Sequence, residues 1–347
     1  MNGLESMQMT DGRDGNEADK RRIAALCDRL AVDAAAAAVR IAPVVRETPL
    51  DHSPRFSQAT GAEVWLKREN LQITGSFKLR GAANRLLTLS AAQRAAGCVA
   101  ASSGNHGIAF AHAVGVLDVP GIVFVPEHAS PAKVASIRAL GVDVRVFGKD
   151  GLDTEQHARS YAAAQGMFYL SPYNDIEVVA GQGSCGIEIV RDLPDCDVAF
   201  VAVGGGGLIG GIGAVLKAHQ PSVRVVACQP SASDVMSRSV AAGRILALPS
   251  EPTLSDGTAG GIEAGAITFD LCTALVDEFV TVSESAIAAA MRCFIDYERQ
   301  LVEGAAGVAI AALIDSARSI RGKKVVVVVC GGNVDRDTLR QILEPGA

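Results

Sequence analysis

The chain has 347 residues, of which 49% are hydrophobic and 20% charged, and its formal net charge is −6. This composition predicts a globular protein of about two domains and excludes an intrinsically disordered chain. A mildly acidic chain with 4% aromatic residues lacks the basic patches and stacking surfaces that nucleic acid requires. No apolar run approaches the ~20 residues of a membrane span, and the polar N-terminus does not resemble a signal peptide. We therefore expect a cytoplasmic protein that binds neither nucleic acid nor membrane.

The elements alternate along the chain. Residues 1–18 are predicted to form a disordered tail, and the alanine-rich stretch from Lys20 to Arg40 predicts a helix. Apolar runs typical of strands then alternate with helical stretches. These runs span residues 97–102, 121–126, 142–147, 197–204, 223–230, 278–283 and 323–332. Nearly continuous Val, Ile and Ala runs indicate strands buried on both faces, so the fold class is α/β with parallel sheets covered by helices.

The eight cysteines are spread through the chain without any C-x-x-C pair. Disulfide frameworks are typical of short secreted domains, and a zinc site needs closely paired ligands. Most of the cysteines are therefore expected to be small buried hydrophobic residues.

The glycine-rich segment VAVGGGGLIGG at 201–211 follows a predicted buried strand and begins a helix. Glycines let the backbone approach a ligand closely, and a helix start offers free N–H groups to an anion. Gly205, Gly207 and Gly210 also satisfy the G-x-G-x-x-G spacing of dinucleotide-binding enzymes. That fold needs an acidic residue after the next strand, where this chain has Cys228 and Gln229. The segment therefore favours a single phosphate group, with a nicotinamide-dependent oxidoreductase as the less favoured alternative.

Lys78 begins an amphipathic helical stretch directly after the segment TGSF. An isolated lysine at such a position is usually a solvated surface residue, yet a cation is unfavourable at a helix N-terminus. A lysine that bonds covalently to an aldehyde is no longer an ammonium, and this chemistry would suit the position. The segment ASSGNHG at 101–107 forms another turn between a predicted strand and a helix. It suits a carboxylate ligand, and it is equally compatible with an ordinary helix cap.

Four motifs in this order, TGSFKLRGA, SSGNHG, VGGGGL and CGGNVD, resemble those of fold-type II pyridoxal-phosphate (PLP) enzymes. The similarity is to the serine/threonine dehydratase and serine racemase group, and it extends from about Ile41 to Leu343. Residues 253–272 resemble a subgroup of hydroxyectoine-utilisation and phenylserine dehydratases. The resemblance implies two parallel-sheet domains with PLP and substrate in the cleft between them, and usually a homodimer. The large domain would comprise residues 19–96 and 173–347, and the small domain residues 97–172.

The resemblance also implies a role for each matching residue. Lys78 matches the lysine that forms the Schiff base with PLP, and Phe77 the residue packed beside the cofactor ring. Asn105 matches the partner of the cofactor's 3-oxygen, and Cys330 takes the place of the Ser or Cys facing the pyridine nitrogen. The phosphate cradle matches Gly204, Gly205, Gly206, Gly207 and Leu208. The turn expected to bind the substrate carboxylate contains Ser102, Ser103, Asn105 and His106.

These parts imply a PLP-dependent lyase that eliminates water and then ammonia from a β-hydroxy amino acid, giving a 2-oxo acid. PLP would supply the electron sink and Lys78 the general base, while a neutral thiol at Cys330 disfavours a long-lived carbanion. Ser103 stands where many threonine dehydratases of the group have Ala. A racemase in which Lys78 and Ser103 serve opposite faces of the substrate is therefore an alternative.

No metal ion is expected in this chain. The positions of the divalent-cation site found in the racemase branch are occupied by Gln229, Ser233 and Val235. Because these side chains are neutral or apolar, they cannot replace the anionic oxygen ligands that a hard cation prefers.

Overall fold

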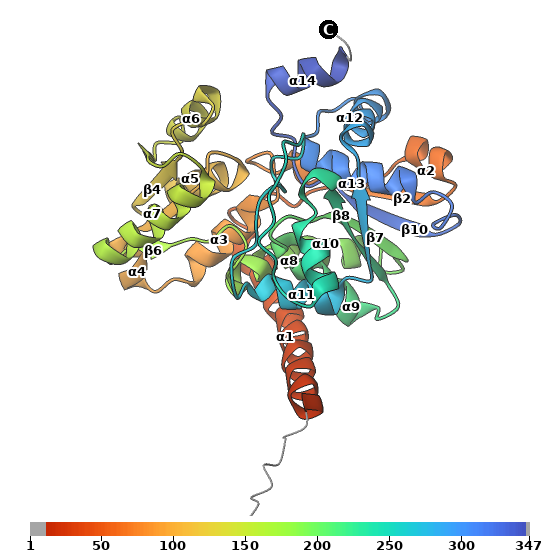
Figure 1. Ribbon diagram of the computed structural model, residues 1–347, viewed down its shortest axis with the longest axis horizontal. Helices are drawn as coiled ribbons and strands as arrows, with labels where there is room; N and C mark the ends of the chain where they lie inside the picture. The colour runs from red at the N-terminus through yellow and green to blue at the C-terminus, as the bar shows by residue number, and fades with distance from the viewer. Residues whose placement is uncertain (1–11, 345–347) are drawn as a thin grey trace, which may run out of the picture.

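The structure is a computed structural model that describes residues 12–344, and it contains two β-sheets (Figure 1). The larger sheet has the strand order β1-β2-β10-β7-β8-β9. Its strands are β1 (Leu50–His52), β2 (Glu63–Lys67), β7 (Val198–Ala202), β8 (Arg224–Pro230), β9 (Glu278–Val282) and β10 (Lys324–Val328). Neighbouring strands are parallel except β1, which is antiparallel to β2. In the register of the centre, Val326 of β10 pairs with Trp65 of β2 and Ala199 of β7.

The smaller sheet is wholly parallel and has the order β5-β4-β3-β6. Its strands are β3 (Cys98–Ala101), β4 (Gly121–Val125), β5 (Asp143–Val146) and β6 (Phe168–Tyr169). The helices beside it are α4 (Ala91–Ala96), α5 (Asn105–Val116), α6 (Pro131–Arg138) and α7 (Gly151–Gln165). Together they form the body on the left of Figure 1.

Helices cover the larger sheet, whose central strand β7 is buried at all five positions. The alanine-rich helix α13 packs against β7, β8, β9 and β10, because its small side chains allow a close approach. The helices before α4 are α1 (Gly12–Ile41), α2 (Pro54–Thr60), the 3-10 helix η1 (Glu69–Leu71) and α3 (Lys78–Thr88). Those after β6 are α8 (Ile176–Asp192), α9 (Gly207–His219), η2 (Ser231–Ser233), α10 (Val235–Ala242), α11 (Ile267–Leu275), α12 (Glu284–Glu298), α13 (Gly304–Asp315) and α14 (Arg336–Leu343). Across residues 12–344, no helix has the length and apolar character needed to cross a membrane.

The structure confirms the α/β prediction, because each of the seven predicted apolar runs contains a strand, namely β3, β4, β5, β7, β8, β9 or β10. The predicted tail lies partly outside the described residues, since residues 1–11 are not described. From Gly12 onward the chain is part of α1, so the helix begins earlier than expected from Lys20. Glu17 and Ala18 are good helix formers and suit this extension, whereas the helix propensities of Gly12, Gly15 and Asn16 do not explain it. The division into two domains stays a prediction; each sheet takes its strands from only one of the two proposed parts.

Candidate active site

Lys78 is the first residue of α3, and its side chain is half-buried. Its Nζ donates a hydrogen bond to the carbonyl of Pro172 at 3.0 Å and lies 5.2 Å from the centre of the Phe77 ring. Burial lowers the pKa of Lys78 to about 8, although nearby Cys330 and Glu303 act in the opposite direction. A lysine with this pKa is partly neutral near physiological pH, and the neutral amine is the form that acts as nucleophile or base.

The segment before Lys78 is held against the chain that follows β10. The N–H of Phe77 donates to the carbonyl of Cys330 at 3.1 Å, and Ser76 forms an antiparallel bridge with Gly331. The thiol of Cys330 is buried, and this burial raises its pKa well above the ordinary range. Cys330 is therefore a protonated, uncharged thiol close to the amine of Lys78.

The glycine loop joins β7 to α9, and its shape depends on the missing side chains. Gly206 has φ +86°, in the left-handed region that favours glycine. A Cβ on Gly205 would lie 2.4 Å from the ring of Tyr173, and one on Gly204 would lie 2.9 Å from the backbone of Thr258. No side chain caps the start of α9, so its first N–H groups are available to an anion. Tyr173 follows Pro172 in sequence, so one short segment contacts both the glycine loop and Lys78.

The turn between β3 and α5 contains the predicted carboxylate-binding residues. The hydroxyl of Ser102 accepts a hydrogen bond from the N–H of Gly104 at 3.1 Å, which stabilises the turn. Ser103 is half-buried, and no hydrogen bond from its hydroxyl occurs within the described part of the chain. The imidazole of His106 is buried, and its Nε2 lies 3.0 Å from the carbonyl of Leu170. Burial lowers the pKa of His106 to about 3, so the ring is neutral and its Nε2–H donates to Leu170.

The place of His106 in a carboxylate-binding turn stays a prediction. Its ring already has a partner, so a ligand contact by this residue would come from its backbone N–H in the first turn of α5. The first N–H groups of α5 face no side-chain cap and favour an anion.

Asn105 belongs to a polar cluster that the sequence analysis missed. Its Nδ2 donates to both carboxylate oxygens of Glu303, at 2.8 and 2.9 Å, and its Oδ1 accepts from Asn333 at 2.7 Å. The backbone N–H of Asn333 also donates to Glu303 at 3.2 Å. Burial raises the pKa of Glu303 to about 7, although its bonds to Asn105 oppose the shift. Asn333 lies in the CGGNVD motif, so the sequence did contain a signal for its place near the site. Glu303 directly precedes α13, and in the sequence it resembles an ordinary acidic residue at a helix start.

Gln229 and Ser233, two of the positions at which no metal is expected, make local hydrogen bonds. The amide of Gln229 donates to the carbonyl of Ser233 at 3.3 Å and accepts from the N–H of Ser237 at 2.8 Å. Val235 is buried. Between residues 12 and 344 no three His, Cys, Asp or Glu side chains are placed to hold a metal ion. Independence from metal stays a prediction.

These residues fit PLP on chemical grounds. Lys78 offers an amine to the aldehyde, the glycine loop offers N–H groups to the phosphate, and Cys330 offers an uncharged thiol. The hydroxyls of Ser76 and Thr268 are buried and have no hydrogen-bond partner among the described residues. Thr268 lies beside the glycine loop, since its Cβ would be 3.1 Å from a Cβ on Gly206. Because an unpaired buried hydroxyl is costly, both are suited to a polar ligand.

Comparison with known proteins defines the class. Residues 41–331 match the family model of pyridoxal-phosphate dependent enzymes, and the chain belongs to this family. An L-threonine ammonia-lyase of Thermotoga maritima is 39% identical over 303 residues, 87% of this chain and 75% of that protein. The processed form of threonine deaminase isoform 2 from Solanum lycopersicum has a TM-score of 0.87 at 32% identity, covering 92% of this chain and 94% of that one. Maize serine racemase has a TM-score of 0.84 at 31% identity, covering 90% and 95%.

The family confirms the predicted fold class and the PLP cofactor, and the protein is a PLP-dependent enzyme. The nicotinamide alternative is set aside. The structure agrees, because β8 ends with buried Cys228, Gln229 and Pro230 and provides no carboxylate for a ribose.

Proposed function

We propose that this enzyme removes water and then ammonia from a β-hydroxy amino acid related to serine or threonine, releasing a 2-oxo acid. The observation that carries the proposal is the amine of Lys78, which is half-buried, donates to the carbonyl of Pro172, has a pKa lowered to about 8 and lies near the uncharged thiol of Cys330. The printed names of the relatives, a threonine ammonia-lyase and a threonine deaminase, support the same reaction class.

The residues divide the work in this proposal. When bound, PLP supplies the electron sink for the bonds at the substrate α-carbon. Lys78 would hold the aldehyde in the resting enzyme. Once the substrate amine has replaced it there, the freed amine of Lys78 would take the α-proton, because a base with a pKa near the working pH is the most effective. Phe77 would pack beside the ring, and Asn105 would contact the 3-oxygen in exchange for one of its two bonds to Glu303. Gly204, Gly205, Gly206, Gly207 and Leu208 hold the phosphate.

Cys330 contributes through its lack of charge. A protonated thiol can hydrogen-bond the ring nitrogen without adding the negative charge that would favour protonation of that nitrogen. A weaker electron sink favours prompt loss of the β-hydroxyl over a long-lived carbanion. This is the chemistry of a dehydratase.

The substrate carboxylate is assigned to the turn that contains Ser102, Ser103, Asn105 and His106. Two features support this assignment: the uncapped N-terminus of α5, and the side-chain bond of Ser102 that shapes the turn. The helix dipole adds to the attraction of an anion there.

Amino-acid racemisation is the second candidate, and Ser103 is the observation that favours it. Its half-buried hydroxyl makes no hydrogen bond to the rest of the described chain. It is therefore free to exchange a proton with substrate on the face opposite Lys78. The similarity to maize serine racemase supports this alternative.

The test is a screen of the holoenzyme for 2-oxo acid release from serine, threonine, phenylserine and hydroxyaspartate, with chiral analysis of the remaining substrate. Lys78→Ala should abolish all turnover and the visible absorbance of lysine-bound PLP. Lys323→Ala removes a half-exposed lysine and is the matched control. Ser103→Ala should spare elimination and abolish any racemisation. Turnover retained by Lys78→Ala would refute the assignment.

We also propose a homodimer in the cytoplasm. The resemblance to the dehydratase group supports the dimer, and the acidic, span-free sequence supports the location. Light scattering of the purified protein tests the first proposal, and fractionation of the source cells tests the second.

A further inference from the structure

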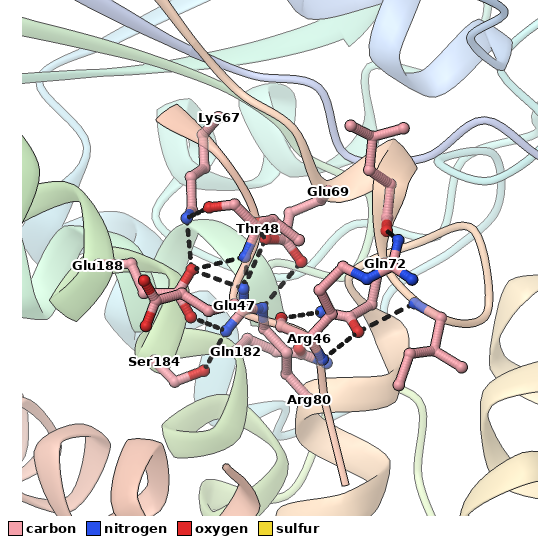
Figure 2. Close-up of polar contacts among 12 residues, drawn as sticks. Arg46, Glu47, Thr48, Lys67, Glu69, Gln72, Arg80, Gln182, Ser184 and Glu188 are labelled. Atoms are coloured by element: carbon pink, nitrogen blue, oxygen red, sulfur yellow. Dashed lines mark hydrogen bonds and ion pairs between the residues drawn. The ribbon is translucent and has the colours of Figure 1, made fainter. Parts of the chain in front are cut away.

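A buried ionic cluster surrounds Arg80, two residues after Lys78 in the first turn of α3. The side chain of Arg80 is fully buried. Its Nε and Nη2 donate to the two carboxylate oxygens of Glu69, each at 2.8 Å. Its Nη1 donates to Glu188 at 2.6 Å and to the hydroxyl of Ser184 at 3.0 Å. Figure 2 shows Arg80 bonded on one side to Glu69 of η1 and on the other to Glu188 of α8.

The cluster is balanced in charge. Lys67, at the end of β2, pairs with Glu188 and donates to the carbonyl of Thr48 at 2.6 Å. Two cations therefore meet two carboxylates, all of them excluded or nearly excluded from solvent. The cost of desolvating such groups offsets most of their attraction, so a buried cluster of this kind adds little net stability. Its clearer consequence is geometric, because the planar guanidinium fork accepts few orientations of its partners.

The backbone around Arg80 is in direct contact with α8. A Cβ on Gly181 would lie 2.6 Å from the carbonyl oxygen of Arg80 and 2.7 Å from the Cα of Gly81. The N–H of Gly81 donates to the side chain of Gln182 at 3.2 Å. The first turn of α3 can therefore move only if α8, η1 or the ionic cluster moves as well. Lys78 lies in this same turn and would move with it.

We propose that Arg80 is a positioning residue for Lys78. By bonding η1 and α8 at once, it fixes the first turn of α3 and thereby the point from which the lysine amine reaches its carbonyl partner. The polar contacts of its side chain are with Thr48, Glu69, Ser184 and Glu188, so it acts through the backbone of α3. The inference rests on the proposed role of Lys78 as the lysine that bonds to PLP.

The experiment removes the bonds of Arg80 to Glu69 and Glu188 while keeping the net charge of the interior unchanged. Arg80→Met combined with Glu188→Gln deletes one positive and one negative charge. The matched control is Arg68→Met combined with Glu298→Gln, which deletes another ion pair with side chains only 6% and 10% exposed. That pair joins the end of β2 to α12 and makes no bond to α3. The full-length proteins, freed of cofactor, are mixed with pyridoxal phosphate. The covalent product is reduced with borohydride at timed intervals and located by mass spectrometry, and melting temperatures are recorded in parallel.

We expect both double variants to lower the melting temperature, whereas only the Arg80 variant slows labelling of Lys78, by roughly 10- to 100-fold. Arg80→Lys keeps the charge without the fork and should show an intermediate rate. Equal labelling rates in the two double variants would overturn the proposal. If the Arg80 double variant does not fold, the Arg80→Lys variant provides the test. Labelling of Lys78 at the wild-type rate in that variant would refute the inference. Labelling of a lysine other than Lys78 in the wild type would instead refute the proposed role of Lys78.

Discussion

Replacing Glu303 by glutamine tests the electrostatics of the site in a measurement of stability. Glu303 is 5% exposed, and its pKa of about 7 compares with 4.5 for an ordinary glutamate. The difference corresponds to about 3 kcal/mol between the two protonation states. Because the pKa is raised on folding, the stabilisation is complete below pH 4.5 and is lost as the pH rises to about 7.

Glu303→Gln cannot ionise, so it should not lose this stability. Its amide nitrogen would face a donor of Asn105 or Asn333, a pH-independent cost of about 1–3 kcal/mol. In addition to that constant cost, wild type loses about 3 kcal/mol of unfolding free energy between pH 4.5 and 7.5, and the variant does not. The unfolding free energy of the variant minus that of wild type should therefore increase by about 3 kcal/mol over this range. The contributions of other titrating groups to the pH dependence are the same in both proteins, if these groups do not contact Glu303, and they cancel in the difference.

The assay is urea unfolding of both proteins at a series of pH values with a fixed concentration of PLP, because bound cofactor adds stability. Glu251→Gln, which removes an exposed carboxylate, is the control. A difference between Glu303→Gln and wild type that does not vary with pH would refute the reasoning. In that case the carboxylate of Glu303 would be solvated, or its hydrogen bonds from Asn105 and Asn333 would fully offset the cost of burying its charge.

Two further predictions concern the cofactor site, and a third concerns independence from metal. Gly205→Ala places a methyl group 2.4 Å from Tyr173 and should cost about 1–3 kcal/mol of stability and weaken PLP binding. Calorimetry and PLP titration should show little effect for Gly115→Ala, where the nearest atom is 3.7 Å away. Cys330→Asp should raise the pKa of the ring nitrogen, change the visible spectrum and slow elimination, whereas Cys330→Ser should keep much of the activity; identical behaviour would place Cys330 away from that nitrogen. A chelator should leave activity unchanged, because Gln229 offers no anionic ligand, and a many-fold loss restored by magnesium would contradict this prediction.

Local sequence was sufficient for the parts of this protein whose physics is local. Strands buried on both faces must be apolar at every position, so β7 and β10 could be recognised as continuous runs. A loop that passes a ligand or a ring at close range must lack Cβ atoms, and this requirement is visible as four consecutive glycines from Gly204 to Gly207. Strands β1 and β6 escaped prediction because they have only three and two residues. Strand β2 begins with Glu63 and ends in Lys67, whose charge is buried only with a partner, so it does not read as an apolar run.

The pairings across the site were decided by the tertiary structure alone. Asn105 and Glu303 are 198 positions apart, and Arg80 and Glu188 are 108 apart, so no periodicity along the chain connects them. A polar residue in a motif is equally compatible with a ligand contact and an internal bond, and the sequence alone does not show that the ring of His106 bonds the carbonyl of Leu170. Whether a buried polar group is free or satisfied depends on what packs against it. That is a property of the folded arrangement, because desolvation and hydrogen bonding act through space and not along the sequence.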